Sequence, residues 1–217
     1  MAGWCCVMEI EFGILNRKEL NESVEVAARA YEHYEYFTNF FPDLEERRRV
    51  LRSLMYRAML TNFEKTHFLT AKIDGKMVAV AQIDDPQYKR PSVLQFLLHG
   101  WLMVYRGVKV KRVNGWIAMD SVASTPCHDY QKADSNIWYT SSVTVDPDFQ
   151  RMGIGSKFIG FWEDYIRERG GTQLILFTNS EKNLAFYKKN GFEIFDERDV
   201  SIPNGKKMRS WSVRKTL

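Results

Sequence analysis

Two glycines, Gly153 and Gly155, stand between an apolar run and an amphipathic helical pattern, a placement that suits anion binding. Asp146-Pro147 ends the apolar run, because proline lacks an amide hydrogen and restricts the residue before it. Beyond the glycines, apolar residues recur at helical spacing from Phe158 to Ile166. This strand, loop and helix gather unpaired backbone amides at the positive end of a helix dipole. Because glycine has no side chain to obstruct an approaching anion, we predict a phosphate or pyrophosphate site.

Two common phosphate-binding loops do not fit this stretch. A P-loop requires Gly-x-x-x-x-Gly-Lys-Ser/Thr, whereas Ser156-Lys157 follow Gly155 in the reverse order. A dinucleotide-binding loop requires a third glycine at the position that Phe158 occupies. The sequence therefore excludes both of these nucleotide-binding loops.

A third motif does fit the glycine stretch. Gln150, Gly153 and Gly155 match Gln/Arg-x-x-Gly-x-Gly/Ala, and the stretch resembles the acetyl-CoA pyrophosphate loop of the GNAT-type N-acetyltransferase superfamily. The flanking stretches 143–147 (VTVDP) and 183–192 (NLAFYKKNGF) are also similar to that family, at the expected separations. An aromatic cluster at 31–41, followed by Phe-Pro-Asp, an acidic and basic run and a helix, further resembles the branch with puromycin-type antibiotic acetyltransferases.

The resemblance implies acetyl-CoA as co-substrate, with no metal. The pantetheine arm is expected beside the fourth strand, and the pyrophosphate in the loop. The implied cofactor contacts are Val143, Thr144 and Val145 on the strand, then Gln150, Arg151, Met152, Gly153, Ile154, Gly155 and Ser156 in the loop, and Asn183 beyond it. Tyr187 matches the family tyrosine that acts as general acid to the departing CoA thiolate, although a tyrosine on a short helix also serves as core packing.

The general base is harder to assign. An amine acceptor has a pKa of about 10, so it must lose a proton before it attacks the thioester. Family members often carry a glutamate on the fourth strand, but residues 137–145 (IWYTSSVTV) contain no carboxylate. Asp120, His128 and Asp129 precede this strand, and Ser141 or Thr140 within it could relay a proton through water. The sequence leaves these alternatives open.

Composition and charge limit the class of protein. The 217 residues, 45% of them hydrophobic, suit a single N-acetyltransferase domain over 1–217. A net charge of +4, without a long basic face, does not predict a nucleic-acid partner. The three cysteines show neither disulfide nor metal-ligand spacing, which favours a reducing compartment. No signal peptide is recognised, and the apolar window 96–105 has about half of the ~20 residues that a membrane helix needs. We expect a cytoplasmic monomer or homodimer with no membrane partner.

The chain is expected to fold as an α/β (α+β) sandwich with helices on both faces of a mixed, mostly antiparallel sheet. About seven strands are predicted, at 8–12, 68–73, 77–83, 137–145, 174–178, 192–202 and 207–213. The resemblance implies that strands four and five splay apart. Asn16 with Glu19, and Asp43 with Glu46, are expected to form capping boxes at two helix starts. Residues 84–135 are expected to form a helical insertion, with helices at 92–105 and 113–123, that covers one sheet face and the acceptor pocket.

These observations predict an acetyl-CoA-dependent N-acetyltransferase that acts on a primary amine by direct attack in a ternary complex. A route through Cys127 is disfavoured, because no base is placed beside that thiol. A small-molecule acceptor is preferred, since the aromatic cluster and the insertion suggest a covered pocket. Two alternatives stay open: a non-catalytic acyl-CoA-binding or sensing module, which the missing strand-four carboxylate allows, and a protein (lysine or N-terminal) acetyltransferase, which needs an open groove.

Overall fold

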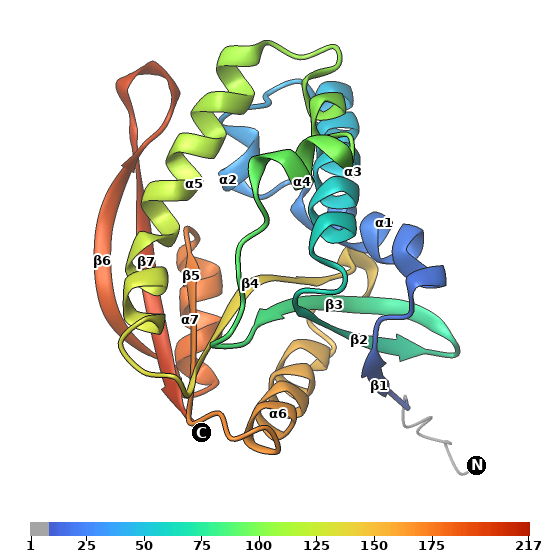
Figure 1. Ribbon diagram of the computed structural model, residues 1–217, viewed down its shortest axis with the longest axis vertical. Helices are drawn as coiled ribbons and strands as arrows, with labels where there is room; N and C mark the ends of the chain where they lie inside the picture. The colour runs from blue at the N-terminus through green and yellow to red at the C-terminus, as the bar shows by residue number, and fades with distance from the viewer. Residues whose placement is uncertain (1–8) are drawn as a thin grey trace, which may run out of the picture.

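The computed structural model describes residues 9–217, so Met8, which we assigned to the first strand, lies outside the described residues. The described part forms a seven-stranded sheet in the order β1-β2-β3-β4-β5-β7-β6 (Figure 1). Neighbouring strands are antiparallel except for β4 and β5, which are parallel. The strands span Glu11–Ile14 (β1), His67–Ile73 (β2), Lys76–Asp84 (β3), Ile137–Val145 (β4), Gln173–Thr178 (β5), Glu193–Ser201 (β6) and Lys207–Thr216 (β7). The predicted mixed, mostly antiparallel sheet is confirmed.

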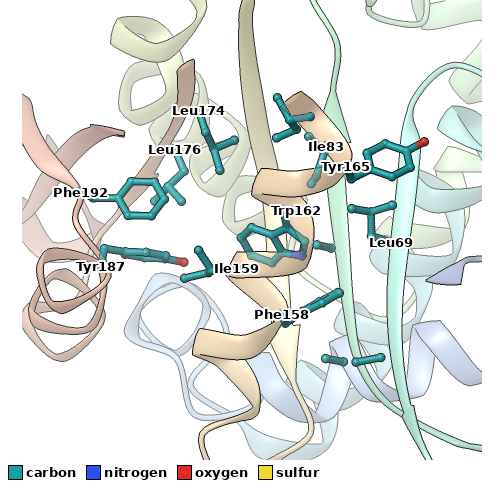
Figure 2. Packing of buried hydrophobic residues seen from close by; sticks show 14 of the residues in the cluster. Leu69, Ile83, Phe158, Ile159, Trp162, Tyr165, Leu174, Leu176, Tyr187 and Phe192 are labelled. Atoms are coloured by element: carbon teal, nitrogen blue, oxygen red, sulfur yellow. The ribbon is translucent and has the colours of Figure 1, made fainter. Parts of the chain in front are cut away.

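Helices cover both faces of this sheet. Within residues 9–217 the α-helices span Leu20–Tyr31 (α1), Glu35–Thr38 (α2), Leu44–Asn62 (α3), Val93–Leu98 (α4), Val110–Gln131 (α5), Ile154–Arg167 (α6) and Glu181–Lys189 (α7). The two sides of β2 show the layering, because side chains alternate along a strand. Leu69 packs with Trp162 of α6 on one face (Figure 2), and Phe68 packs with Met59 of α3 on the other. None of the helices in the described range is both long enough and apolar enough to cross a membrane.

Strands β4 and β5 separate after a short parallel stretch. Ile137, Trp138 and Tyr139 of β4 pair with residues 173–175 of β5. From there β4 continues along β3 as far as Val145, while β5 pairs with β7. The splay that we expected between the fourth and fifth strands is therefore confirmed, and it leaves one edge of β4 free to accept an extended ligand.

The insertion between β3 and β4 differs from the prediction in its helix boundaries. The helix expected at 92–105 is instead α4 followed by the 3-10 helix η2 (Trp101–Tyr105), because Gly100 between them has a φ of +78°, which no α-helix allows. The helix expected at 113–123 extends over Val110–Gln131 and contains Pro126. Packing of Cys127 against β4 and β5 stabilises this extended helix beyond the proline.

The turn and cap signals were mostly confirmed. The Asp74-Gly75 hairpin turn has φ values of +50° and +73°, as a two-residue hairpin loop requires. Asn16 and Glu19 form the predicted capping box, although it opens a 3-10 turn, Arg17–Glu19, that leads into α1. Asp43 accepts a hydrogen bond from the Glu46 amide at 2.7 Å, which is the first half of the box predicted at the start of α3.

Candidate active site

The glycine loop has the geometry of an anion site, and its two glycines are required for different reasons. Gly153 precedes α6 with a φ of +78°, and a Cβ placed there would meet nothing within 4 Å. Open space therefore lies beside the N-terminal amides of α6, which have no partners within the helix. Gly155 instead allows close packing, because a Cβ there would lie 3.0 Å from the Phe186 ring of α7. Arg151 also adopts a positive φ, of +65°, so the loop is tightly curved.

The predicted loop contacts separate into exposed and structural residues. Arg151, Met152, Gly153 and Ser156 are exposed, whereas Ile154 is buried in the core beneath them. The Gln150 side chain donates to the Val145 carbonyl oxygen at 3.1 Å, and so holds the loop to the end of β4. Backbone amides rather than the Gln150 side chain are therefore the donors that the loop offers to an anion.

An ion-pair cluster fixes the turn that leads into the loop. The buried Asp146 carboxylate accepts from the Asp148 amide at 3.0 Å and lies 3.3 Å from Arg29 of α1. Arg29 also donates to Asp148 at 2.7 Å, a contact that raises the pKa of Arg29 and lowers that of Asp148. The cluster attaches the turn to α1, so α1 positions the start of the glycine loop.

A cavity of about 270 Å³ opens beside the splayed end of β4. The β4 residues along it run from Tyr139 to Val143, with Leu176 to Asn179 of β5 and its following turn beside them. Aromatic side chains form much of the remaining wall: Tyr31, Tyr34, Tyr36 and Phe37 from α1, α2 and the turn between them, and Phe96, Trp101 and Trp116 from the insertion. The insertion thus lies along the cavity, as predicted, and the open space is large enough for a small organic molecule.

The cofactor residues predicted on β4 contribute mainly backbone. Val143 lines the cavity, and its carbonyl oxygen accepts from the Tyr31 hydroxyl at 3.4 Å. The Thr144 side chain points away, because its hydroxyl donates to the Val80 carbonyl oxygen of β3 at 3.2 Å. Asn183 of α7 also lines the cavity, close to Tyr34, whose hydroxyl accepts from the Asn179 amide at 3.0 Å.

Tyr187 lies on α7 with its ring in the core and on the cavity wall. The ring packs edge-on against Phe186 and Phe192, with centroids 5.4 and 5.5 Å away. In Figure 2 its hydroxyl points away from Phe192, towards Ile159 of α6. Burial, together with the neighbouring Tyr31 and Tyr34, raises the pKa of Tyr187, so the hydroxyl keeps its proton at neutral pH. The side chain is therefore both packing and a potential proton donor.

The predicted base candidates Asp120, His128 and Ser141 all line this one cavity, although they are far apart in the sequence. Asp120 accepts a hydrogen bond from the Tyr36 hydroxyl, and burial raises the pKa of its carboxyl. His128 packs edge-on against Tyr139 at 5.1 Å, and burial, with Arg90 and Lys132, lowers its pKa. Asp129 is different: it is exposed beside Lys132 at 3.4 Å and does not line the cavity.

Asp84 also lines the cavity, although no pattern in the sequence marked it as a site residue. It ends β3 opposite Tyr139 of β4, rather than beginning the insertion, and only 2% of its surface is exposed. Its carboxylate accepts from the Thr66 hydroxyl and, at 3.1 Å, from the Gln82 side chain. Burial nevertheless raises the pKa of Asp84 to about 6. The sequence could have indicated Asp84, because β4 has no carboxylate and the neighbouring strand β3 carries one opposite Tyr139 of β4.

Cys127 is not suited to nucleophilic chemistry. It lies in a small apolar cluster with Ile137, Tyr139 and Ile175, with none of its surface exposed. Burial raises the pKa of the thiol to about 12, so it is not ionised at neutral pH. Within residues 9–217, no three His, Cys, Asp or Glu side chains are grouped so that they could hold a metal ion.

Comparisons with known proteins agree with this geometry. Residues 29–192 match the model of the acetyltransferase (GNAT) family. Among similar solved structures is a GCN5-related N-acetyltransferase from Rhodopseudomonas palustris, with 16% identity, a TM-score of 0.58, and coverage of 97% of this chain and 98% of that one. The ribosomal-protein-S18-alanine N-acetyltransferase from Escherichia coli has 15% identity and a TM-score of 0.56, with 96% and 94% covered. PaiA N-acetyltransferase from Thermoplasma acidophilum, in complex with coenzyme A, has 14% identity and a TM-score of 0.55, with 97% and 100% covered. These structures share the fold described above.

Proposed function

Because this chain belongs to the GNAT family of acetyltransferases, and is therefore an acetyl-CoA-dependent N-acetyltransferase, we propose that its acceptor is a primary amine of a small molecule. The amine attacks the acetyl thioester directly, in a ternary complex. One observation carries the proposal: the free edge of β4 opens into a cavity that the insertion covers and that aromatic and acidic side chains line.

The residues present fit the two ends of acetyl-CoA. The exposed loop amides after Gly153 suit a pyrophosphate, and the space beside Gly153 supports this assignment. The free edge of β4 around Val143 and Val145 suits the extended pantetheine arm, whose amides can pair with a strand. A backbone amide of β4 can then stabilise the negative charge that develops on the thioester oxygen.

Asp84 is the base that this cavity supports best. An amine with a pKa of about 10 arrives protonated, so a nearby carboxylate first attracts the ammonium and then accepts its proton. A carboxyl whose pKa lies at about 6 is ionised at neutral pH and is a stronger base than an ordinary aspartate. The Asp120 carboxylate accepts a hydrogen bond from the Tyr36 hydroxyl. We propose that Asp120 attracts the cationic acceptor and does not serve as the base.

Tyr187 is assigned as the acid. Its hydroxyl points towards Ile159 of α6 (Figure 2), its side chain also lines the cavity, and its raised pKa keeps it protonated until the CoA thiolate leaves. This role completes the direct transfer: Asp84 accepts one proton from the ammonium before the attack and later releases it to solvent, and Tyr187 donates its proton to the sulfur as the C–S bond breaks. The nitrogen loses its second proton after the attack, and this proton restores the Tyr187 hydroxyl, so that the products are the amide and the CoA thiol. Cys127 takes no part, because it is buried and un-ionised.

The lining indicates the kind of acceptor. Tyrosine and tryptophan faces bind cations and flat apolar groups, and the two carboxylates favour an amine. Within residues 9–217, the buried Thr140 hydroxyl and the Trp116 ring nitrogen line the cavity without a hydrogen-bond partner, so the acceptor can supply polar groups to both. A compact aromatic or cyclic amine that carries an oxygen substituent matches these features.

The test is thiol release from acetyl-CoA with the full chain and a panel of amines. The panel contains aromatic amines, linear polyamines, amino acids and short peptides with free lysine or N-terminal amines. We expect the highest kcat/KM for the compact aromatic or cyclic amines. Faster turnover of the peptides would instead identify a protein acetyltransferase.

A further inference from the structure

Exposed apolar side chains concentrate on one short segment. Among residues 9–217, six of the eleven exposed large hydrophobic side chains lie between Val93 and Met103, on α4 and η2. They are Val93 (76% exposed), Leu94 (64%), Leu97 (42%), Leu98 (76%), Leu102 (67%) and Met103 (43%). We call these six residues the leucine patch. Proteins seldom expose so many neighbouring apolar side chains unless these side chains contact a partner molecule or a membrane.

The segment that carries the leucine patch is firmly held on its other side. Phe96 and Trp101 turn inward to line the acceptor cavity and pack edge-on, with ring centroids 5.0 Å apart. Arg57 of α3 donates to the His99 carbonyl oxygen at 3.1 Å, and Lys65 donates to Gln95 at 3.1 Å. In Figure 1, α4 lies against α3. The residues of the leucine patch therefore lie on the outer face of a segment whose inner face packs against α3 and the cavity.

A basic groove borders the leucine patch and shares Met103 with it. The groove, of about 610 Å³, runs between α1, α3 and η2. Four of its lining residues are arginines: Arg49, Arg52, Arg57 and Arg106. The one carboxylate in its lining is Glu25, which pairs with Arg52 at 2.9 Å. We call it the arginine groove. Its surplus of guanidinium groups suits phosphate oxygens.

The sequence around the leucine patch is basic and contains no acidic residues to balance its positive charge. Residues 86–119 contain no aspartate or glutamate, but they contain Lys89, Arg90, Arg106, Lys109, Lys111 and Arg112. All of these except Arg112, which pairs with Glu46 of α3, are exposed. Apolar residues flanked by lysine and arginine are typical of segments that lie in the interface of an anionic bilayer.

We propose that the leucine patch and the arginine groove form a docking surface for an anionic lipid membrane. The leucines enter the boundary between headgroups and acyl chains, and the groove holds the phosphate of a headgroup beside them. Charge favours this occupant over a second copy of the chain. In a two-fold dimer the same surface faces itself, so the basic residues would face one another.

A membrane-docking surface departs from our expectation of no membrane partner, which rested on the short apolar window 96–105. The absence of a spanning helix in residues 9–217 excludes crossing the membrane through one of them, but docking in the interface needs only a few exposed apolar side chains. Because Phe96 and Trp101 lie behind the leucine patch, docking brings the cover of the acceptor cavity to the membrane. An acceptor amine dissolved in the bilayer would then reach the enzyme locally.

The test is sedimentation of the full chain with phosphatidylcholine vesicles, with and without phosphatidylglycerol. We expect binding to the anionic vesicles, weakened by added salt because the charges are exposed. Replacing two leucines together, Leu94→Asp and Leu98→Asp, should lower the partition coefficient about tenfold or more, since each loses apolar burial. Arg106→Glu should also lower it about tenfold. Ile14→Asp, at a residue 60% exposed on β1, is the matched control and should leave binding unchanged.

Other outcomes would overturn the proposal. Failure to bind anionic vesicles would do so, as would equal loss of binding in the Ile14→Asp control. Self-association that the double leucine variant abolishes, without any vesicle binding, would identify a second copy as the occupant. Binding to anionic vesicles that the leucine and Arg106 variants leave intact would assign the membrane to another surface. Acetyl-CoA binding and circular dichroism should show that every variant is folded.

Discussion

The protonation state of Asp84 links the site to pH. The carboxylate predominates above its pKa of about 6, so with one amine the rate should rise as the pH passes through this value. Stability has the opposite dependence. The folded chain holds this proton more tightly than the unfolded chain, in which an aspartate titrates at about 3.9. Asp84 therefore contributes stability below about pH 4, and that contribution is lost as the pH rises to about 6.

Replacing Asp84 by asparagine tests the proposed base. We expect Asp84→Asn to lower kcat about 100-fold or more and to remove the acidic limb that we expect in the wild-type profile at a pH of about 6. The free energy of unfolding at neutral pH should stay equal or rise, because the variant removes a buried charge and the Gln82 side chain can still donate to the amide oxygen. Steady-state pH profiles and urea unfolding provide these values.

Asp129→Asn is the control for Asp84, since Asp129 is exposed and outside the cavity. It should keep the wild-type rate and pH profile. If Asp84→Asn behaves in the same way, Asp84 is not the base, and Asp120→Asn and His128→Gln become the variants to compare.

Tyr187→Phe tests the proposed acid. The ring and its contacts with Phe186 and Phe192 remain, so stability should change little. Loss of the hydroxyl should lower kcat about 10- to 100-fold, with little change in the Kd for acetyl-CoA. Calorimetric titration and steady-state rates separate the two effects. Tyr130→Phe, which alters a hydroxyl bonded to Gln173 outside the cavity, should leave both unchanged. Equal turnover by Tyr187→Phe would reduce Tyr187 to a packing residue.

For single residues, local sequence motifs predicted one part of the candidate site, whereas the folded surroundings of a side chain determined the other. The glycine loop and Tyr187 were predicted as site residues from spacing and family resemblance, which need only the local sequence, and their roles stay predictions. Asp84 was not found, since its altered pKa arises from burial among β2, β3 and β4, which local spacing does not reveal. The role of Gln150 was also hidden: its bond to the Val145 carbonyl depends on how the loop folds back on β4.

Among the helices, α6 is flanked by two glycines of similar conformation that can be compared by substitution. Gly153 and Gly170 lie at opposite ends of this helix, with φ values of +78° and +80°, and a Cβ at either would meet nothing within 4 Å. Alanine at either position should therefore cost a similar conformational strain of about 1 kcal/mol. The N-terminus differs from the C-terminus, however, because only its amides can bind an anion.

Gly153→Ala should raise the Kd for acetyl-CoA about tenfold, while Gly170→Ala should leave it near the wild-type value. Both variants should unfold at slightly lower urea concentrations than the wild type, by similar amounts. The measurement is the acetyl-CoA Kd of each variant alongside its unfolding midpoint. Equal affinities in the two variants would place the pyrophosphate away from this loop.

The strands were more predictable than the insertion for a physical reason. β-branched and apolar alternation, with the Asp74-Gly75 turn, specifies β2 and β3 locally, and β4 was predicted with its observed bounds. The insertion depends on contacts with distant residues. Arg57 bonds the His99 carbonyl beside Gly100, where the helical pattern breaks, and the far end of α5 is held by packing of Cys127 on the sheet. No local pattern contains this information.

In the whole molecule, the cavity that we propose for the acceptor is assembled from segments that are far apart in the chain. Tyr36 of α2 bonds Asp120 of α5, and Arg49 of α3 donates to the Gly107 carbonyl oxygen at 2.8 Å. These contacts join the aromatic cluster, α3 and the insertion above the splayed strands. The size of the cavity is thus a property of the complete fold, and a change on the walls formed by α3 or the insertion should alter acceptor selection without altering the acetyl-CoA loop.

Ala58 on α3 provides such a change, because it is a small residue on the cavity wall. Ala58→Phe should fill part of the 270 Å³ and raise the KM for the preferred amine about tenfold or more. The Kd for acetyl-CoA should stay within about twofold, since the pyrophosphate loop is untouched. Ala118→Phe, at an exposed position of α5 outside the cavity, controls for an added ring and should change neither value. If Ala58→Phe turns over every amine as the wild type does, the acceptor binds elsewhere, because a ring that occupies its site must exclude it.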